Sequence, residues 1–124
     1  MKFLTLDDNY AMLDIYECFL AGVFPGAIVK KALNNKEAWL ILKDFTPDLI
    51  ITDLIHPPGG NGLDFLRELH QDITKNSIPI ICISGNAGVF MGEKEFDAVF
   101  NKPVSLWILL DYIKGFLPQI SQKN

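Results

Sequence analysis

The chain has 124 residues, of which 49% are apolar and 21% are charged, a composition typical of one globular domain rather than a disordered chain. Its formal net charge of -4 disfavours nucleic acid as a partner, because neutralising phosphates requires clustered lysine and arginine. No apolar run is long enough to span a membrane, and the acidic start of the chain is unlike a signal peptide. We therefore expect one cytoplasmic domain over residues 1–124, with its core at about 2–118 and a short polar tail.

The two cysteines, Cys18 and Cys82, lie far apart in the sequence, each among apolar neighbours. We interpret them as two buried thiols, in a reducing compartment, rather than as a disulfide or a metal-binding pair. The two histidines have no neighbours with the spacing of metal ligands, so a structural zinc site is not expected.

The first half of the chain alternates short apolar runs with segments of helical periodicity. A strand is predicted over residues 2–6, and Asp8 or Asn9 can cap the helix that follows. The apolar stripe of this helix consists of Met12, Ile15, Tyr16, Phe19, Leu20 and Val23. A second strand is predicted over residues 27–33, followed by a helix through Trp39, Leu42 and Phe45.

The second half repeats this alternation. A third strand is predicted over residues 48–54, and a loop rich in proline and glycine separates it from a third helix. One face of that helix is predicted to carry Leu63, Leu66, Leu69 and Ile73. Strands over 78–84 and 98–104 flank a segment whose glycines allow at most a short helix, and a last helix is predicted at about 105–117.

Strands that are apolar on both faces and alternate with helices indicate a parallel sheet covered by helices on both sides. The predicted fold class is therefore α/β, with an open, doubly wound, five-stranded parallel sheet. Sheets of this kind place their functional sites at the carboxyl ends of the strands.

Five polar residues stand at these predicted strand ends. Asp7 and Asp8 follow the first strand, Asp53 the third, Ser84 the fourth and Lys102 the fifth. Three crowded carboxylates require a cation or raised pKa values, and oxygen ligands of this kind suit Mg²⁺. A lysine and a hydroxyl beside them could contact a phosphoryl group. Each residue alone has an ordinary explanation as a helix cap or turn residue, but their joint occurrence at successive strand ends predicts a site.

With these residues in place, the whole sequence resembles the response-regulator receiver domain, the CheY-like phosphoacceptor of two-component systems. The segments that carry the resemblance are LDDN at 6–9, PDLIITDL at 47–54, PxGxNGL at 57–63, IPIICISG at 78–85 and NKPV at 101–104. The resemblance implies the flavodoxin-like strand order 2-1-3-4-5. It also implies a signalling role rather than an enzymatic one, with at most self-catalysed phosphorylation and dephosphorylation.

The resemblance also implies a role for each site residue. Asp53 would be the phosphoacceptor, and Asp7 and Asp8 would hold Mg²⁺ together with Asp53 and the backbone carbonyl of Ile55. In addition, Ser84 and Lys102 would contact the phosphoryl group, with Ser84 as the switch hydroxyl. The donor would be a phosphohistidine on a sensor histidine kinase or a histidine phosphotransfer protein, and the output would pass to a downstream protein partner.

The sequence departs from the receiver pattern after the fourth strand. The aromatic switch residue expected three positions before Lys102 is replaced by Val99, and Phe100 stands one place later, where its side chain faces the opposite side of the strand. We therefore expect Phe100 to be a core residue. The interval from Ser84 to Lys102 is about one helical turn shorter than usual, which predicts a shortened or irregular fourth helix.

The last helix is more apolar than one buried face requires, since Leu106, Trp107, Leu110 and Phe116 cannot all point into a small core. Such surface predicts a partner contact or a homodimer through the fourth segment and the last helix, unless the fourth segment covers it.

Two other functions are compatible with parts of the pattern. A pseudo-receiver, which signals without phosphorylation, would account for Val99 and the short fourth segment, but not for the retention of all five site residues. A haloacid-dehalogenase-like phosphatase also uses an aspartate nucleophile and Mg²⁺, but it needs a second acid two residues after the nucleophile, where this chain has Ile55.

Overall fold

The computed structural model describes residues 1–53, 62–75, 77–84, 98–102 and 104–115, and for residues 62–66, 84 and 101 it describes the backbone alone. The strands are β1 (Lys2–Leu6), β2 (Ile28–Ala32), β3 (Leu49–Thr52), β4 (Ile80–Ser84) and β5 (Ala98–Asn101). The helices of this described part are α1 (Tyr10–Val23), α2 (Asn35–Leu42), α3 (Gly62–Gln71) and α5 (Leu106–Lys114). The predicted fourth helix would fall in residues 85–97, which lie outside the described residues.

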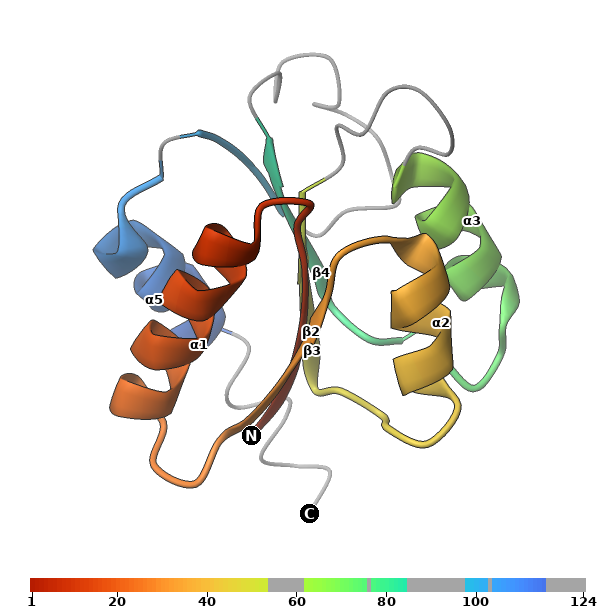
Figure 1. Cartoon of the computed structure of the whole chain (residues 1–124), viewed down its shortest axis with the longest axis horizontal. Coiled ribbons are helices and arrows are strands. Elements are labelled where there is room, and N and C mark those ends of the chain that lie inside the picture. The colour runs from red at the N-terminus through yellow and green to blue at the C-terminus, as the bar shows by residue number, and fades with distance from the viewer. Residues whose placement is uncertain (54–61, 76, 85–97, 103, 116–124) are drawn as a thin grey trace.

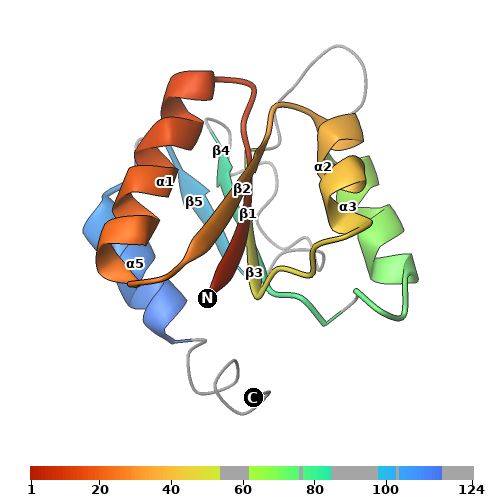
Figure 2. The same ribbon diagram turned by 60° about the horizontal axis from the view of Figure 1, so that its bottom comes forward.

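The five strands form one sheet in the order β2-β1-β3-β4-β5, with every neighbouring pair parallel. Helices α1 and α5 cover one face of the sheet, and α2 and α3 cover the other (Figures 1 and 2). The predicted doubly wound α/β fold and its strand order are therefore confirmed.

Two hydrophobic cores lie on the two faces of this sheet. The core on the α2/α3 side contains Leu4, Leu6, Ala32, Ala38, Leu42, Ile50, Leu69, Ile78, Ile80 and Cys82. The core on the α1/α5 side contains Phe3, Tyr16, Leu20, Leu49, Ile51, Ile81, Ile83, Leu109 and Ile113. Strand β3 is central, and all four of its residues are buried, which explains why Leu49, Ile50 and Ile51 form an apolar run before Thr52.

The first helix begins where the sequence predicts. The side chain of Asn9 accepts a hydrogen bond from the backbone N–H of Ala11 at 3.0 Å, which satisfies a donor that the first turn leaves unpaired. Asp7 follows β1 directly, and the capped helix α1 begins three residues later. Asp7, Asp8 and Asn9 therefore lie at the carboxyl edge of the sheet.

Three side-chain predictions were wrong. Ile73 was expected on the apolar face of α3, but it lies beyond the helix end and is 79% exposed. Cys18 was expected to be buried, but it is exposed, because α1 turns Leu13, Tyr16 and Leu20 inward instead. The same rotation leaves Ile15, a member of the predicted stripe, 46% exposed. Cys82 is buried as predicted.

No helix in the described ranges has the length and apolar character needed to cross a membrane.

Candidate acidic site at the carboxyl ends of the strands

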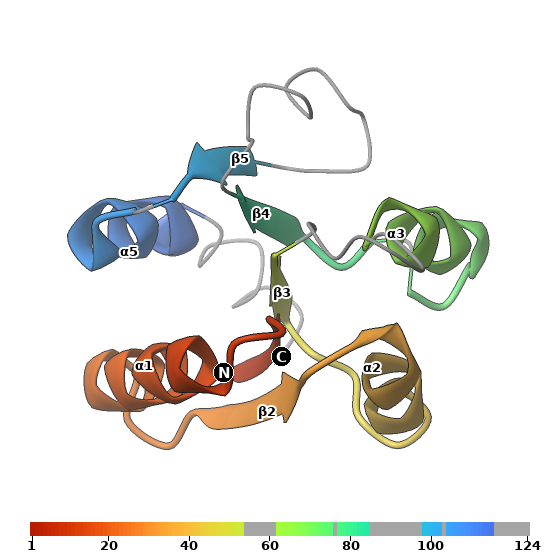
Figure 3. The same cartoon turned by 45° about the horizontal axis from the view of Figure 1, so that its top comes forward.

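The site lies where the carboxyl ends of β1 and β3 meet, at the edge that comes forward in Figure 3. The parallel ladder continues one residue beyond each strand, since Asp7 N–H donates to the carbonyl of Ala32 at 3.1 Å and Asp53 N–H donates to the carbonyl of Leu6 at 2.9 Å. These bonds fix the backbone of both aspartates at neighbouring positions on the sheet edge.

Three carboxylates gather at this edge. One carboxylate oxygen each from Asp7, Asp8 and Asp53 lies within 4.8 Å of the other two. Asp7 is 1% exposed and Asp53 is 8% exposed, whereas Asp8 is exposed to solvent. A group of like charges this close is unfavourable unless positive charge lies among them.

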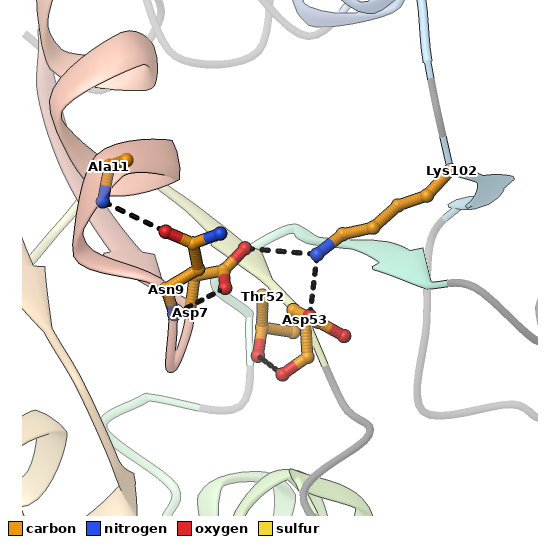
Figure 4. Close-up of polar contacts among 6 residues, drawn as sticks. All are labelled: Asp7, Asn9, Ala11, Thr52, Asp53 and Lys102. Carbon is orange, nitrogen blue, oxygen red and sulfur yellow. Dashed lines mark hydrogen bonds and ion pairs between the residues drawn. The ribbon is translucent and has the colours of Figure 1, made fainter.

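Lys102 supplies positive charge to this group. Its Nζ atom donates to Oδ2 of Asp53 at 2.6 Å and to Oδ2 of Asp7 at 3.1 Å (Figure 4). Lys102 follows directly after β5, at the far side of β4 from Asp53, so its long side chain reaches across the sheet edge to the acids. The other oxygen of Asp7, Oδ1, accepts a hydrogen bond from the backbone N–H of Asn9 at 2.9 Å.

The pKa values of the site follow from burial and from these contacts. Burial raises the pKa of Asp7, although the hydrogen bond from Asn9 and the ammonium of Lys102 oppose the shift. For Lys102, burial acts to lower the pKa, but the hydrogen bonds and charges of Asp53 and Asp7 outweigh it, so the pKa is raised. Lys102 therefore stays charged well into the alkaline range.

Two neighbours of the site are affected by it. Burial, followed by the negative charge of Asp7, raises the pKa of Tyr16 to about 12. Burial, followed by the charge of Asp53, raises the pKa of the Cys82 thiol to about 12. Tyr16 was predicted only as a member of the apolar stripe of α1, because a tyrosine at helical spacing carries no signal of what its hydroxyl faces.

The structure thus brings together four of the predicted site residues, Asp7, Asp8, Asp53 and Lys102. Ser84 is the last residue of β4, paired with Asn101 of β5, which puts its backbone at the same edge, and its side chain lies outside the described residues. The predicted ligand Ile55 also lies outside them.

Val99 and Phe100 face opposite sides of the sheet. Val99 packs against the core on the α2/α3 side, and Phe100 packs against the core on the α1/α5 side. The ring of Phe100 meets that of Tyr112 on α5 edge to face, with centroids 5.5 Å apart. The prediction that the single-residue shift turns the aromatic side chain to the other face agrees with this packing.

The donor set of the acidic group fits a small hard cation. In the described part of the chain it consists of carboxylate oxygens without nitrogen or sulfur ligands, and one of its residues, Asp8, is exposed, so water could complete the coordination. This chemistry favours Mg²⁺ over zinc.

A parallel sheet of this order with acids and a lysine at its carboxyl edge defines the class of CheY-like α/β proteins. Within that class, the structure is similar to the crystal structure of a response regulator receiver domain protein (CheY-like) from Methanospirillum hungatei, with a TM-score of 0.82 and 26% identity over 99% of this chain and 98% of the other. The sequence matches the family model of the response regulator receiver domain over residues 3–113, and the chain belongs to this family.

Curated relatives agree with this family. The chain is 24% identical to stress response regulator protein 1 of Lodderomyces elongisporus in an alignment that covers 99% of this chain. It is 30% identical to response regulator Rre1 of Synechocystis in an alignment that covers 68% of this chain. It spans about a third of the length of these relatives, 34% and 36% respectively. Receiver domains of this family are signalling modules of two-component systems with a general phosphoacceptor role.

Proposed function

We propose that the chain is a single receiver domain over residues 1–124 and that Asp53 accepts a phosphoryl group from a phosphohistidine of a sensor histidine kinase or a histidine phosphotransfer protein. The observation that carries this proposal is the contact of Lys102 with both Asp53 and Asp7, within a group of three carboxylates. A structural ion pair would need one acid, whereas phosphoryl transfer needs a nucleophile, a cation ligand set and a mobile positive charge in one place.

The proposed reaction is a displacement at phosphorus. A carboxylate oxygen of Asp53 forms a bond to phosphorus while the phosphorus–nitrogen bond of the donor breaks, and the bonding electrons leave with the imidazole, which takes up a proton. Lys102 already lies on one oxygen of Asp53, and it can move onto a phosphoryl oxygen as negative charge shifts there. Its raised pKa keeps it charged throughout.

The acidic group would hold Mg²⁺ through Asp7, Asp8 and Asp53, with the backbone carbonyl of Ile55 as a further ligand. When bound, the ion supplies positive charge that offsets the carboxylates and the incoming phosphoryl oxygens. Burial of Asp7 supports this assignment, because a carboxylate with a raised pKa gains most when a cation arrives.

The output is proposed to be a switch in a protein-interaction surface. Ser84 would hydrogen-bond the phosphoryl group and carry the change into the neighbouring segment. A downstream partner or a second copy could bind at α5, where Trp107 is 70% exposed and Ile108 is exposed as well. A pseudo-receiver is the second candidate. Two departures from the receiver pattern favour it: the absence of an aromatic side chain at Val99 and the shortened interval between Ser84 and Lys102.

The test uses intact-mass measurement after incubation with Mg²⁺ and acetyl phosphate. One phosphoryl adduct is expected in the wild type and in Asp44→Asn, a matched change at an exposed aspartate away from the site. Asp53→Asn should carry none. An unmodified wild type would favour the pseudo-receiver, and an adduct that survives in Asp53→Asn would contradict the assignment of Asp53.

A further inference from the structure

A pocket of about 420 Å³ lies on the α1/α5 side of the sheet, beside the acidic site. Helix α1 contributes Met12, Ile15 and Tyr16 to its wall, and Ile83 of β4 contributes to it as well. Among the described residues, Lys102 and Val104, which follow β5, and Leu106, the first residue of α5, also line it. Helices α1 and α5 run side by side here (Figures 1 and 3).

Among the described residues that line this pocket, five are apolar and two, Tyr16 and Lys102, carry polar groups. The ammonium of Lys102 is already bonded to Asp53 and Asp7, so the hydroxyl of Tyr16 is the polar group to be accounted for. Pockets of roughly this size, apolar with a few polar groups, are typical of small-molecule sites. The volume alone, however, does not identify an occupant.

Tyr16 provides the second observation. Its side chain is 3% exposed, yet its hydroxyl forms no hydrogen bond with any of the residues that the structure describes. A buried polar group without a partner costs free energy, so a buried hydroxyl normally has a protein, water or ligand partner. A tyrosine hydroxyl is protonated at neutral pH, so it can act as a donor.

We propose that this Tyr16 pocket binds a small, mostly apolar molecule that carries one hydrogen-bond acceptor, with the apolar part against Met12 and Leu106 and the acceptor facing the Tyr16 hydroxyl. A strongly anionic ligand fits less well. The ammonium of Lys102 is already bonded to Asp7 and Asp53, and these two carboxylates would repel an anion. Ile15, which is 46% exposed at the pocket wall, leaves a route for entry.

A bound molecule would also affect the acidic site, a consequence that rests on the proposed function. The stem of Lys102 lines the pocket while its ammonium pairs with Asp53. An occupant packed against this stem would hold Lys102 in place and oppose its movement onto a phosphoryl oxygen. Occupancy should therefore slow phosphorylation of Asp53.

The binding test is a methyl NMR titration of the unphosphorylated protein with two matched probes. Acetophenone carries a carbonyl acceptor, and α-methylstyrene has nearly the same shape with a methylene group in place of the carbonyl oxygen. Saturable shifts are expected at the methyl groups of Met12, Ile15, Ile83 and Leu106. The ratio of the two affinities should fall roughly three- to tenfold in Tyr16→Phe, the value of one hydrogen bond.

Two further variants distinguish binding in this pocket from nonspecific hydrophobic binding elsewhere on the protein. Ile15→Trp fills the pocket from an exposed position that folding tolerates, and it should abolish the shifts. Leu40→Trp makes the same kind of change at an exposed residue in a second pocket near β2, and it should leave them intact. Three results would contradict the proposed binding site. The chemical shifts could be absent or fail to saturate, the affinity ratio could be unchanged in Tyr16→Phe, or the two tryptophan variants could have equal effects.

The coupling is tested by the rate of phosphorylation from acetyl phosphate with and without saturating acetophenone. A rate roughly fivefold lower or more is expected in the wild type and no change in Ile15→Trp. An equal rate in the wild type would refute the coupling while leaving the binding site standing. If no phosphorylation occurs at all, the proposed function fails, and the NMR titration still decides whether the pocket binds.

Discussion

Lys102 donates a hydrogen bond of 2.6 Å to Asp53, although 49 residues separate them in the chain. The same Nζ atom bonds Asp7, which is 95 residues away, so one cation joins acids from two neighbouring strands. Asp53 is almost fully buried, and a buried carboxylate that loses its partner is strongly destabilising. This relationship makes Lys102 both a stabilising element of the resting fold and the group that must move when a phosphoryl group arrives.

Replacing Lys102 by Met should lower the free energy of unfolding by about 1–3 kcal/mol, between the values for exposed and buried ion pairs, because it leaves adjacent carboxylates without their cation. Urea denaturation with EDTA measures this loss, and saturating Mg²⁺ should reduce it. Lys31→Met removes the contacts to Asp14 and Glu17 on the surface and is the control, with a smaller expected loss because water and salt screen exposed ion pairs. Equal losses in the two variants would show that the Lys102 contacts contribute no more than a surface pair.

Magnesium should stabilise the folded protein without any phosphodonor. At about a hundred times its Kd, a ligand that binds only the folded state adds about 2.7 kcal/mol, which thermal unfolding detects as a higher Tm. Asp8→Asn should weaken this gain, and in EDTA it should not destabilise the protein, because it removes one of three crowded charges. Asp44→Asn should behave as wild type. A Tm that is insensitive to Mg²⁺ in all three proteins would argue against the metal site.

The raised pKa of Asp7 predicts a particular pH dependence in EDTA. Its pKa in the folded state lies above the unfolded value of 3.8, so the folded state binds more protons between those two values. Stability contributed by this group is therefore lost as the pH rises from 3.8 through the folded pKa. Relative to Asp7→Asn, the wild type should become less stable over that window and level off above it. A relative gain for the wild type with rising pH would mean that its pKa is lowered instead.

Phe100 and Val99 should respond differently to truncation. Phe100→Ala removes the edge-to-face contact with Tyr112 and part of the α1/α5-side core, so it should cost about 2–3 kcal/mol, somewhat less than a fully buried phenylalanine. Val99→Ala removes much less volume and should cost about 1 kcal/mol. Phosphorylation by acetyl phosphate should persist in both. Loss of phosphorylation in a stable Phe100→Ala protein would instead give Phe100 a role in the site.

Much of the fold was predictable because the central strands β1, β3 and β4 are largely apolar and buried, and because they alternate with segments of helical periodicity. The position of the acids followed from the same pattern, since Asp7 and Asp53 come directly after strands that the sheet aligns. The rotation of α1 was not predictable. Its apolar residues span more than one face, so Cys18 and Ile15 could equally have been placed inward. The contact of one lysine with two acids, and the buried hydroxyl of Tyr16, depend on side-chain geometry that residue spacing does not encode.

The most direct test of the central claim is to locate the phosphoryl group chemically. After phosphorylation in Mg²⁺, borohydride reduces an aspartyl phosphate to homoserine, and peptide mass spectrometry then identifies the modified position. Homoserine is predicted at residue 53 alone and should be absent when Mg²⁺ is replaced by EDTA. Homoserine at Asp7 or Asp8, or none at any position in a protein that remains folded, would contradict the assignment of Asp53 as the phosphoacceptor.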